Sequence, residues 1–212
     1  MIREPTRTEG ERMAEQEMIG RSGVAPTTTW LTQRAVSGTI GVLAFVVMMA
    51  LGAHVRIPLP GTPVPVTLQT FFVYLAGATL GPVLGPASQA IYLLIGAAGL
   101  PVFAGGAGGL HYLLAAPTAG YLIGFVAATS LIGWLVRRRE DPGVAWILLS
   151  MAAGSTALYA CGVAWLAWSF DLSLADAVAK GFLPFLLGDA AKVGAAAGLF
   201  RGYRRRARTV FP

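Results

Sequence analysis

The amino-acid sequence predicts an all-α membrane protein, a compact bundle of six transmembrane helices with both termini in the cytoplasm. Of its 212 residues, 55% are hydrophobic and only 12% are charged, whereas a typical soluble domain has about 25% charged residues. From Ile57 through Val136 there is no Asp, Glu, Lys or Arg. No soluble fold hides that much uncharged surface, but a lipid bilayer favours it.

Six apolar stretches are expected to be the membrane spans: about 36–53, 66–81, 83–100, 117–136, 144–168 and 182–200. A helix needs roughly 20 residues to cross a hydrocarbon core of about 30 Å, so the second and third stretches are short. They are joined by Leu80-Gly-Pro-Val-Leu-Gly-Pro86, where repeated Gly and Pro favour a tight turn over a kink in one long helix. Small residues four apart predict close helix packing, as at Gly77/Gly81, Gly120/Gly124 and Gly194/Gly198.

The positive charges indicate how the helices are oriented. The formal net charge is +6, and the excess lies in Arg137–Arg139 and in the segment from Arg201 to Arg208. Both clusters directly follow apolar stretches, as cytoplasmic helix ends do. Six crossings place both clusters on the side of the termini, whereas five crossings would separate them. The same positions argue against a nucleic-acid partner.

Three regions are expected along the chain. Residues 1–34 are predicted to form a mobile polar tail, because residues 1–30 lack helical periodicity. Residues 35–200 are predicted to be the six-helix transmembrane substrate-binding domain, and residues 201–212 a basic cytoplasmic tail. A cleavable signal peptide is not expected, since no short apolar core with an A-x-A site follows the leader.

Two connections on the outer side are unusually apolar. His54 to Gln69 contains four prolines within eight residues, which forbid a helix and favour an extended path. This loop is either a rigid re-entry segment or a lid over an outward-facing cavity. The second loop, Gly99 to Leu110, is rich in glycine, which lets backbone N–H groups approach a ligand or lets the chain turn.

One pair of opposite charges lies inside a predicted span. Asp189 and Lys192 are three residues apart and therefore share a helix face. If the helix begins near Phe182, they lie about 10 and 15 Å along it, at 1.5 Å per residue. A charge at that depth is unfavourable by about 2.5–3.5 kcal/mol and usually marks a substrate or ion path. A carboxylate and an ammonium side by side fit a ligand with an N–H beside a carbonyl, such as a cyclic urea or amide.

Four segments carry a family resemblance. They are Pro65-Val-Thr-Leu-Gln-Thr70, Gly96-Ala-Ala-Gly-Leu-Pro-Val-Phe-Ala104 followed by Gly-Gly, Ala116-Pro-Thr-Ala-Gly-Tyr-Leu-Ile-Gly-Phe125 and Pro184-Phe-Leu-Leu-Gly-Asp-Ala-Ala-Lys192. In order and spacing they resemble the BioY proteins, the biotin-binding subunits of energy-coupling-factor (ECF) vitamin importers. The chain departs from that pattern at Ala116 and Ala119, which replace glycines. It also lacks a strict A-x-x-x-A docking pattern on the first helix.

The resemblance implies a six-helix S-component that captures biotin from outside the cell membrane. It implies that Asp189 and Lys192 contact the ureido ring and that the loop carrying Thr67 and Gln69 closes over the ligand. Biotin also has a carboxylate, for which Arg56, Thr118 and the backbone N–H groups of Gly105–Gly109 are alternatives. The family segments add three further residues to the expected site, namely Phe103, Gly106 and Tyr121.

The resemblance implies that transport also needs a membrane coupling subunit and a pair of cytoplasmic ATPases. This sequence contains no P-loop, so the energy for transport has to come from another protein. Some relatives are proposed to work alone. The expected partners are therefore biotin, the lipid bilayer and that coupling module, with no cofactor, no metal and no nucleic acid.

Three other functions compete with biotin capture. The first is an S-component for another small vitamin, which would share the fold and differ in the pocket. The second is an intramembrane enzyme, but H-E-x-x-H and G-x-S-x-G are absent, and Cys161 with two scattered histidines forms no catalytic constellation. The third is a passive channel, which needs a polar-lined pore that these spans scarcely provide.

Overall fold

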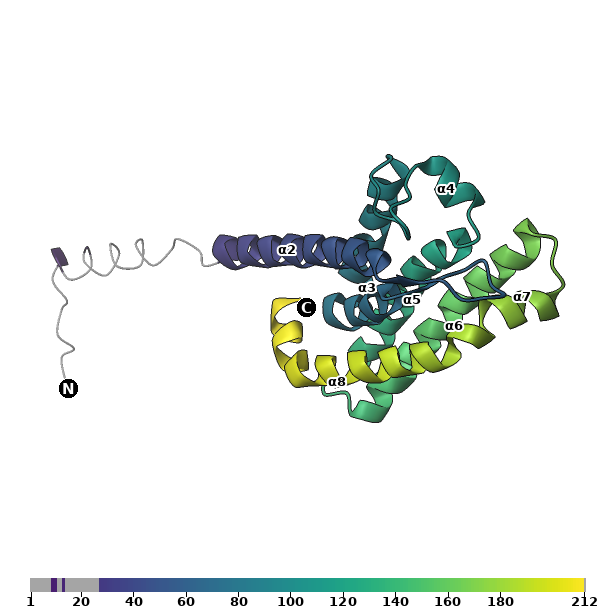
Figure 1. The fold of residues 1–212 in the computed structure, drawn as a ribbon. Helices are drawn as coiled ribbons and strands as arrows, with labels where there is room; N and C mark the ends of the chain where they lie inside the picture. The colour runs from purple at the N-terminus through teal and green to yellow at the C-terminus, as the bar shows by residue number, and fades with distance from the viewer. Residues whose placement is uncertain (1–8, 11–12, 14–26, 212) are drawn as a thin grey trace. The chain divides into compact units, whose positions relative to one another are not determined.

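The computed structural model describes residues 9–10, 13 and 27–211, and its regular structure is almost entirely helical (Figure 1). The chain divides into two compact units, residues 1–36 and 37–212, and the second contains the candidate functional site described below. The helices are α2 (Thr27–His54), α3 (Gln69–Ala97), α4 (Leu110–Ala115), α5 (Ala119–Arg137), α6 (Val144–Ser169), α7 (Leu174–Gly181) and α8 (Leu186–Val210). A 3-10 turn η1 (Leu183–Phe185) precedes α8, and strands β1 (Arg56–Ile57) and β2 (Val66–Thr67) follow α2.

Helix α3 is a hairpin of two helical arms. Its regular geometry is broken at Gly81, which has φ 82° and ψ −169°, a conformation that favours glycine. On either side of this turn, Gly85 lies against Gly77, since a Cβ on Gly85 would be 3.4 Å from the Gly77 Cα. Farther out, the Gln69 side chain donates a hydrogen bond to the Tyr92 hydroxyl at 2.8 Å. Residues this far apart in sequence meet only if the two arms run antiparallel.

This hairpin reconciles the predicted and observed spans. Five helices of the described chain are long and apolar enough to cross a membrane, and α3 is one of them. Because α3 folds back at Gly81, the bundle has six crossing segments, and the predicted tight turn between the second and third spans is confirmed. Its arms, residues 69–80 and 82–97, rise about 18 and 24 Å. Both are shorter than a hydrocarbon core of about 30 Å.

Four of the helices form a closed helix ring. Helix α3 packs against α5, α5 against α6, α6 against α8, and α8 against α3. Glycines permit the closest of these approaches, because a Cβ on Gly77 would lie 3.0 Å from the Thr129 carbonyl oxygen of α5, and one on Gly124 would lie 2.9 Å from the Leu158 oxygen of α6. Gly194 and Gly198 instead face open space, so that predicted packing pair is wrong for the isolated bundle.

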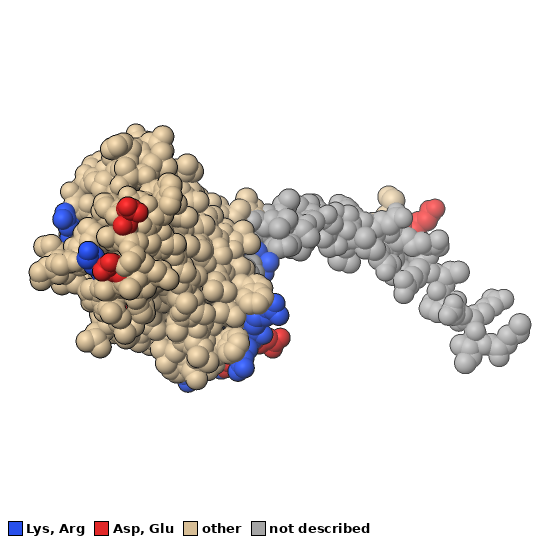
Figure 2. Space-filling model, turned by 90° about the vertical axis from the view of Figure 1, so that its right-hand side faces the viewer, with Lys and Arg blue, Asp and Glu red and all other residues tan. Residues whose placement is uncertain are grey.

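The surface agrees with a membrane environment. Figure 2 shows a face that is almost wholly free of charged residues, with Lys, Arg, Asp and Glu confined to small clusters. Large apolar side chains are exposed on every long helix, for example Val47 on α2, Ile123 on α5 and Leu187 on α8. Such exposure is expected where lipid, not water, is the solvent.

The arginine-rich end of the bundle is more ordered than the sequence predicted. The expected tail, residues 201–212, is helical as far as Val210. Arg208 donates to the carbonyl oxygens of Val136, at 2.6 Å, and Arg139. The Arg137 guanidinium donates to the Thr79 carbonyl at 3.3 Å, where the break at Gly81 leaves the first arm of α3 without its own donors. These contacts, and the good helix propensity of Arg, continue α8 beyond residue 200.

Two helix starts also differ from the prediction. Helix α2 begins at Thr27, earlier than the predicted residue 36, and Thr residues favour such a start. The rest of the predicted tail, apart from residues 9–10 and 13, lies outside the described residues. The last span was predicted to begin near Phe182, but the chain forms α7, then the 3-10 turn around Pro184, and begins α8 at Leu186. Proline lacks the N–H that a continuous helix needs there.

The two apolar connections fold onto the bundle. The first is a short hairpin in which Arg56 pairs with Thr67 and Ile57 with Val66. Its proline-rich stretch, residues 58–65, forms no helix, as predicted, but it turns at residues 60–61 and bends at 63–64 instead of running extended. The second, residues 98–109, turns through glycines with positive φ and is closed by a bridge between Phe103 and Ala107.

Candidate functional site

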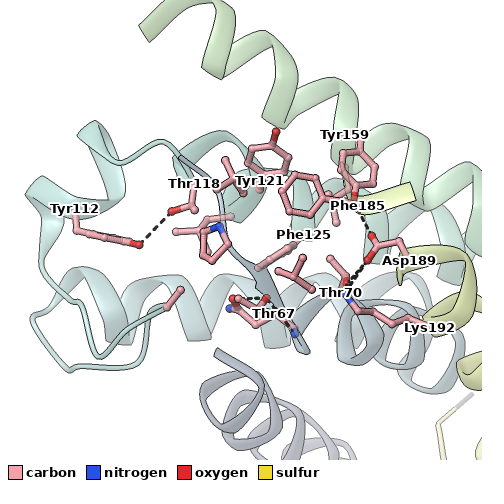
Figure 3. Close-up of a pocket in the computed structure, with 17 residues that line it drawn as sticks. Thr67, Thr70, Tyr112, Thr118, Tyr121, Phe125, Tyr159, Phe185, Asp189 and Lys192 are labelled. Carbon is pink, nitrogen blue, oxygen red and sulfur yellow. Dashed lines mark hydrogen bonds and ion pairs between the residues drawn. The ribbon is translucent and has the colours of Figure 1, made fainter. Parts of the chain in front are cut away.

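A cavity within the helix ring contains about 550 Å³ of atom-free space, part of it open to the outside (Figure 3). Helices α3, α5, α6 and α8 supply its walls, and the segment Val64–Thr67 at the end of the first connection covers one side. Its polar side chains gather at two ends. Asp189 and Lys192 lie at one, and Thr118 with Tyr112 at the other.

The Asp189 carboxylate accepts four hydrogen bonds from side chains around the cavity. The residue is only 4% exposed, and both carboxylate oxygens accept two hydrogen bonds each. Oδ1 accepts from the Thr70 hydroxyl at 3.0 Å and from the Lys192 ammonium at 2.8 Å. Oδ2 accepts from the hydroxyls of Tyr74, at 2.9 Å, and Tyr159, at 2.8 Å. Four donors from α3, α6 and α8 therefore converge on one buried carboxylate, as a buried charge requires.

The donors are themselves linked. Lys192 Nζ also donates to the Thr70 hydroxyl at 2.9 Å, so Lys192, Thr70 and Asp189 form a closed triangle. The Tyr74 hydroxyl lies 3.1 Å from the Ser155 hydroxyl. Because Tyr74 has a single proton and gives it to Asp189, Ser155 donates to Tyr74. The network fixes the charge at one location before any ligand arrives.

Local helix geometry explains why Asp189 can be charged here. Helix α8 begins at Leu186, so Asp189 lies in its first turn and not some 10 Å along a span, as the sequence predicted. A helix N-terminus carries a partial positive charge that stabilises a nearby carboxylate by about 0.3–1 kcal/mol. Pro184 explains why α8 starts this late. It lies at the beginning of the 3-10 turn, and because it has no N–H it prevents α7 from continuing directly into α8.

Aromatic side chains form the apolar walls between the two polar ends. Tyr121 and Phe125 come from α5, Tyr159 from α6 and Phe185 from η1. The Tyr159 ring meets Phe182 edge to face with centroids 4.9 Å apart and lies 6.0 Å from Tyr121. Such contacts fix the ring plane. The combination of a few fixed polar groups with apolar walls is typical of small-molecule sites.

Five predicted site residues outside the first connection line this cavity: Asp189, Lys192, Gln69, Thr118 and Tyr121. Thr67, also predicted, lines it from the end of β2. The Thr67 hydroxyl donates to Gln69 Oε1 at 3.1 Å, while the Gln69 amide donates to Tyr92. The Tyr92 hydroxyl in turn donates to the Val102 carbonyl at 2.8 Å. Through these hydrogen bonds Gln69 links α3 to both apolar connections, and its side-chain oxygen and nitrogen already have partners.

At the other end, the Thr118 hydroxyl donates to the Tyr112 hydroxyl at 3.3 Å, and both groups face the cavity. Thr118 immediately precedes α5, whose first backbone N–H groups carry partial positive charge. Tyr121 presents its ring to the cavity but gives its hydroxyl to the Gly181 carbonyl at 2.7 Å, which ties α5 to the end of α7.

Three predicted site residues do not line the cavity. Phe103 is fully buried beneath it, stacked on Tyr112 at 5.5 Å, and supports that residue instead of facing a ligand. Gly106 is exposed and uses its N–H to bond the Phe103 carbonyl within the turn. Arg56 is also exposed and lies against Gly105, so it connects the two apolar connections next to the cavity residue Ala104.

Sequence reasoning missed several residues that surround Asp189, namely Thr70, Tyr74, Ser155 and Tyr159. Thr70 and Tyr74 are four residues apart and follow the Pro65–Gln69 string, so helical spacing would have placed them on one face of α3. Tyr159 stands in a long apolar helix, where a hydroxyl needs a buried partner. The described residues contain no cluster of three or more His, Cys, Asp or Glu that would hold a metal ion.

Comparisons with known proteins agree with this arrangement. The family model described as the BioY family matches residues 25–209. A biotin transporter BioY of Thermotoga maritima is 42% identical over 153 residues, which are 72% of this chain and 87% of that protein. A biotin transporter BioY of Rhizobium etli is 38% identical over 162 residues, covering 73% and 86%. The solved S-component for biotin from an ECF-type ABC transporter superposes with a TM-score of 0.74 at 25% identity, over 82% of this chain and 93% of that one.

Proposed function

The chain belongs to the BioY family, and from that premise we propose that it captures biotin in the cavity of the helix ring as the substrate-binding component of an ECF-type importer. The buried Asp189 with its ring of donors is the observation that supports the proposal most strongly. At the end of an aromatic-walled cavity, this buried ion pair offers both an anion and a cation to a small polar ligand. The fold, the spans and the relatives place the protein among multi-pass cell-membrane transporters.

The ureido ring of biotin has N–H groups beside a carbonyl, which matches the Asp189 end. Every acceptor position of the Asp189 carboxylate is already filled, so a ligand N–H binds only by displacing a donor. Tyr74 is fully buried and Tyr159 is held by aromatic neighbours, which makes both poor candidates for movement. Lys192 is 15% exposed and has a flexible stem. We expect the ligand N–H to replace Lys192 at Oδ1, while the ammonium turns to the ureido carbonyl.

The valerate carboxylate then points toward the opposite end of the cavity. There the Thr118 and Tyr112 hydroxyls and the start of α5 offer donors and partial positive charge. Arg56 stands outside the lining, so it acts on the anion only at longer range. We therefore expect Thr118 to contribute more than Arg56 to binding the biotin carboxylate. The backbone N–H groups of residues 105–109 are a third source of donors for this anion.

The first connection acts as the lid in this proposal, because Val64–Thr67 already form one side of the cavity. A cysteine placed at Pro65, which is partly exposed and lines the cavity, should react with an aqueous maleimide in the free protein and be protected when biotin saturates the site. Cysteine at Pro58, which is exposed and does not line the cavity, is the control. Equal labelling of Pro65→Cys with and without biotin would reduce the loop to a connector.

Energy for transport comes from outside this chain, through a membrane coupling subunit and a pair of cytoplasmic ATPases. The arginine-rich end, with Arg137–Arg139 and Arg201–Arg208, faces the cytoplasm in this arrangement. Reporter fusions after Arg139 and Arg208 should therefore report the inside, and a fusion near Gly106 the outside. An outside signal after Arg139 would reverse the orientation.

The direct test is equilibrium binding of radiolabelled biotin to the purified protein. Biotin should bind at one site per chain, and excess unlabelled biotin should compete while riboflavin and thiamine should not. Displacement by another vitamin at lower concentration than biotin would favour the alternative S-component. Absence of any biotin binding by folded protein would overturn the proposal.

A further inference from the structure

A second concave site lies on the outside of the helix ring, between α6 and α8. This lateral groove contains about 1330 Å³ of atom-free space, part of it open. Its walls are mostly apolar, including Leu148, Ala152 and Val163 of α6 and Val193 of α8, and the α7 side is closed by Phe182. It is separate from the biotin cavity, but Tyr159 and Asp189 line both.

The polar atoms at the floor of the groove already have partners within the protein. Tyr159 donates to Asp189, Ser155 pairs with Tyr74, and the Thr156 hydroxyl donates to the Ala152 carbonyl at 3.0 Å. Water needs several polar partners to occupy such a space, and a polar ligand would need unpaired groups. The groove therefore suits an apolar occupant.

The rim of the groove is continuous with the lipid-facing surface. Leu149 and Leu186 line it and are 63% and 47% exposed, and the neighbouring Leu187 is 86% exposed. In a bilayer this surface meets hydrocarbon chains, and an unfilled groove would forfeit dispersion contacts along its walls. A single flexible chain fits a groove between two splayed helices without requiring a complementary protein surface.

We propose that the lateral groove binds one acyl chain of a membrane phospholipid, and that the bound chain holds Tyr159 in the position from which it donates to Asp189. The second half rests on the proposed biotin function. Tyr159 forms part of the wall between groove and cavity and is packed on Phe182, which also lines the groove. With the groove filled, the ring is confined on both faces. With the groove empty, the ring keeps its contacts with Phe182 and Tyr121 but loses packing on the groove side. The hydroxyl then donates to the carboxylate for less of the time, and ligand binding has to restore the ordered arrangement.

The first test measures lipid retention by native mass spectrometry after mild detergent purification. The wild type should retain a phospholipid, and the groove-filled double variant Ala160→Phe/Ala190→Leu should lose it, because both alanines line the groove. Ala164→Phe is the control, since Ala164 is exposed on α6 and lines neither site. Equal retention by the double variant and the control would overturn the proposal. Disulfide-linked dimers of Ala160→Cys in a Cys161→Ser background would also overturn it, because a second copy would then occupy the groove.

The second test measures biotin affinity as a function of lipid. Restraining one side chain is worth about 0.5–1.5 kcal/mol, so extensive delipidation should weaken biotin binding by roughly three- to tenfold. Added palmitoyl-oleoyl-phosphatidylglycerol should restore the wild type and Ala164→Phe but leave the groove-filled variant unchanged. Retained lipid with no effect on biotin affinity would overturn the coupling to Tyr159. If biotin binds in no condition, the proposed function fails, while the lipid-retention result stands by itself.

Discussion

Two carboxylate–cation pairs of similar length occupy opposite environments in this protein. Lys192 and Asp189 are 2.8 Å apart in the helix ring, with side chains 15% and 6% exposed. Arg204 and Asp141 are 2.6 Å apart at the arginine-rich end, where Asp141 is 56% exposed. Asp189 has three further protein donors, whereas Asp141 is approached by Arg205 at 3.8 Å. Distance alone therefore does not distinguish a binding site from a surface pair.

The two carboxylates differ in whether water and salt can replace their protein partners. Water and salt readily take the place of either partner around Asp141, so such pairs contribute little. Asp189 is buried, so removing one of its partners leaves an incompletely compensated charge, which is unfavourable by several kcal/mol. A buried carboxylate with four donors at the end of a cavity is therefore better explained by a ligand N–H that replaces one donor than by a contribution to stability. Substitutions at the buried pair should therefore change biotin affinity much more than substitutions at the exposed pair.

The largest effect is expected from Asp189→Asn. It keeps the size of the side chain but removes an ionised acceptor, and a hydrogen bond to a charged group contributes about 1.5–3 kcal/mol. Biotin binding should weaken roughly ten- to a hundredfold, at about 1.4 kcal/mol per decade. Lys192→Met should act in the same direction, because it removes the donor proposed for the ureido carbonyl. Calorimetric titration with biotin measures both.

Either single change also strands the remaining charge, so stability must be measured beside affinity. The double variant Asp189→Asn/Lys192→Met removes both charges and should recover thermal stability relative to the singles. If the pair is the ligand site, this well-folded variant still fails to bind biotin. Wild-type affinity in the double variant would show that the pair is structural only.

A smaller effect is expected from Tyr159→Phe, which keeps the ring and removes one of the four donors. The net contribution of one hydrogen bond is about 0.5–1.5 kcal/mol, so biotin affinity should fall by roughly two- to tenfold. Tyr203→Phe is the matched control, because the Tyr203 hydroxyl pairs with Thr79 at 2.6 Å, away from the cavity. Equal losses of affinity in both variants would indicate a general effect on the bundle.

The sequence was sufficient for the spans because lipid imposes its requirement on each segment independently. The uncharged run from Ile57 to Val136 and the Gly-Pro repeat at Gly81 together indicated the number of crossings. Asp189 and Lys192 stood out as the one pair of opposite charges inside a predicted span, and the motif resemblance then assigned them to the ligand. Neither signal reports how helices are rotated against one another.

That rotation decides the rest of the site. Thr70 and Tyr74 reach Asp189 across 119 and 115 residues of sequence, and their approach depends on the α3 hairpin. Phe103 looked like a ligand contact, yet the glycine-rich turn directs its ring beneath Tyr112. Tyrosines also carry no formal charge, so a search for intramembrane charges passed over the donors that make Asp189 tolerable.

The carboxylate end provides a finer comparison between a lining and a bordering residue. Thr118→Val keeps the shape of the side chain and removes a hydroxyl inside the cavity. It should weaken biotin binding by roughly two- to tenfold, the value of about one hydrogen bond. Arg56→Ala removes an exposed charge outside the lining and should change affinity by less than about threefold. The reverse ranking in a direct titration would make Arg56 the partner of the valerate carboxylate.

The smallest effect is expected from Asp141→Asn, the exposed counterpart of the first substitution. A hydrogen bond from Arg204 holds the pKa of Asp141 below its usual range, with further help from the charges of Arg204, Arg205 and Arg201. A lowered pKa in the folded state contributes stability above the unfolded pKa of about 3.9, and this stability is lost as the pH falls through the folded value. The variant should therefore melt slightly below wild type at pH 7 in low salt, and the difference should vanish in strong acid or high salt. Biotin affinity at pH 7 should be unchanged. A loss of affinity comparable to that of Asp189→Asn would mean that the two ends of the bundle are coupled and that burial does not separate a binding pair from a surface pair.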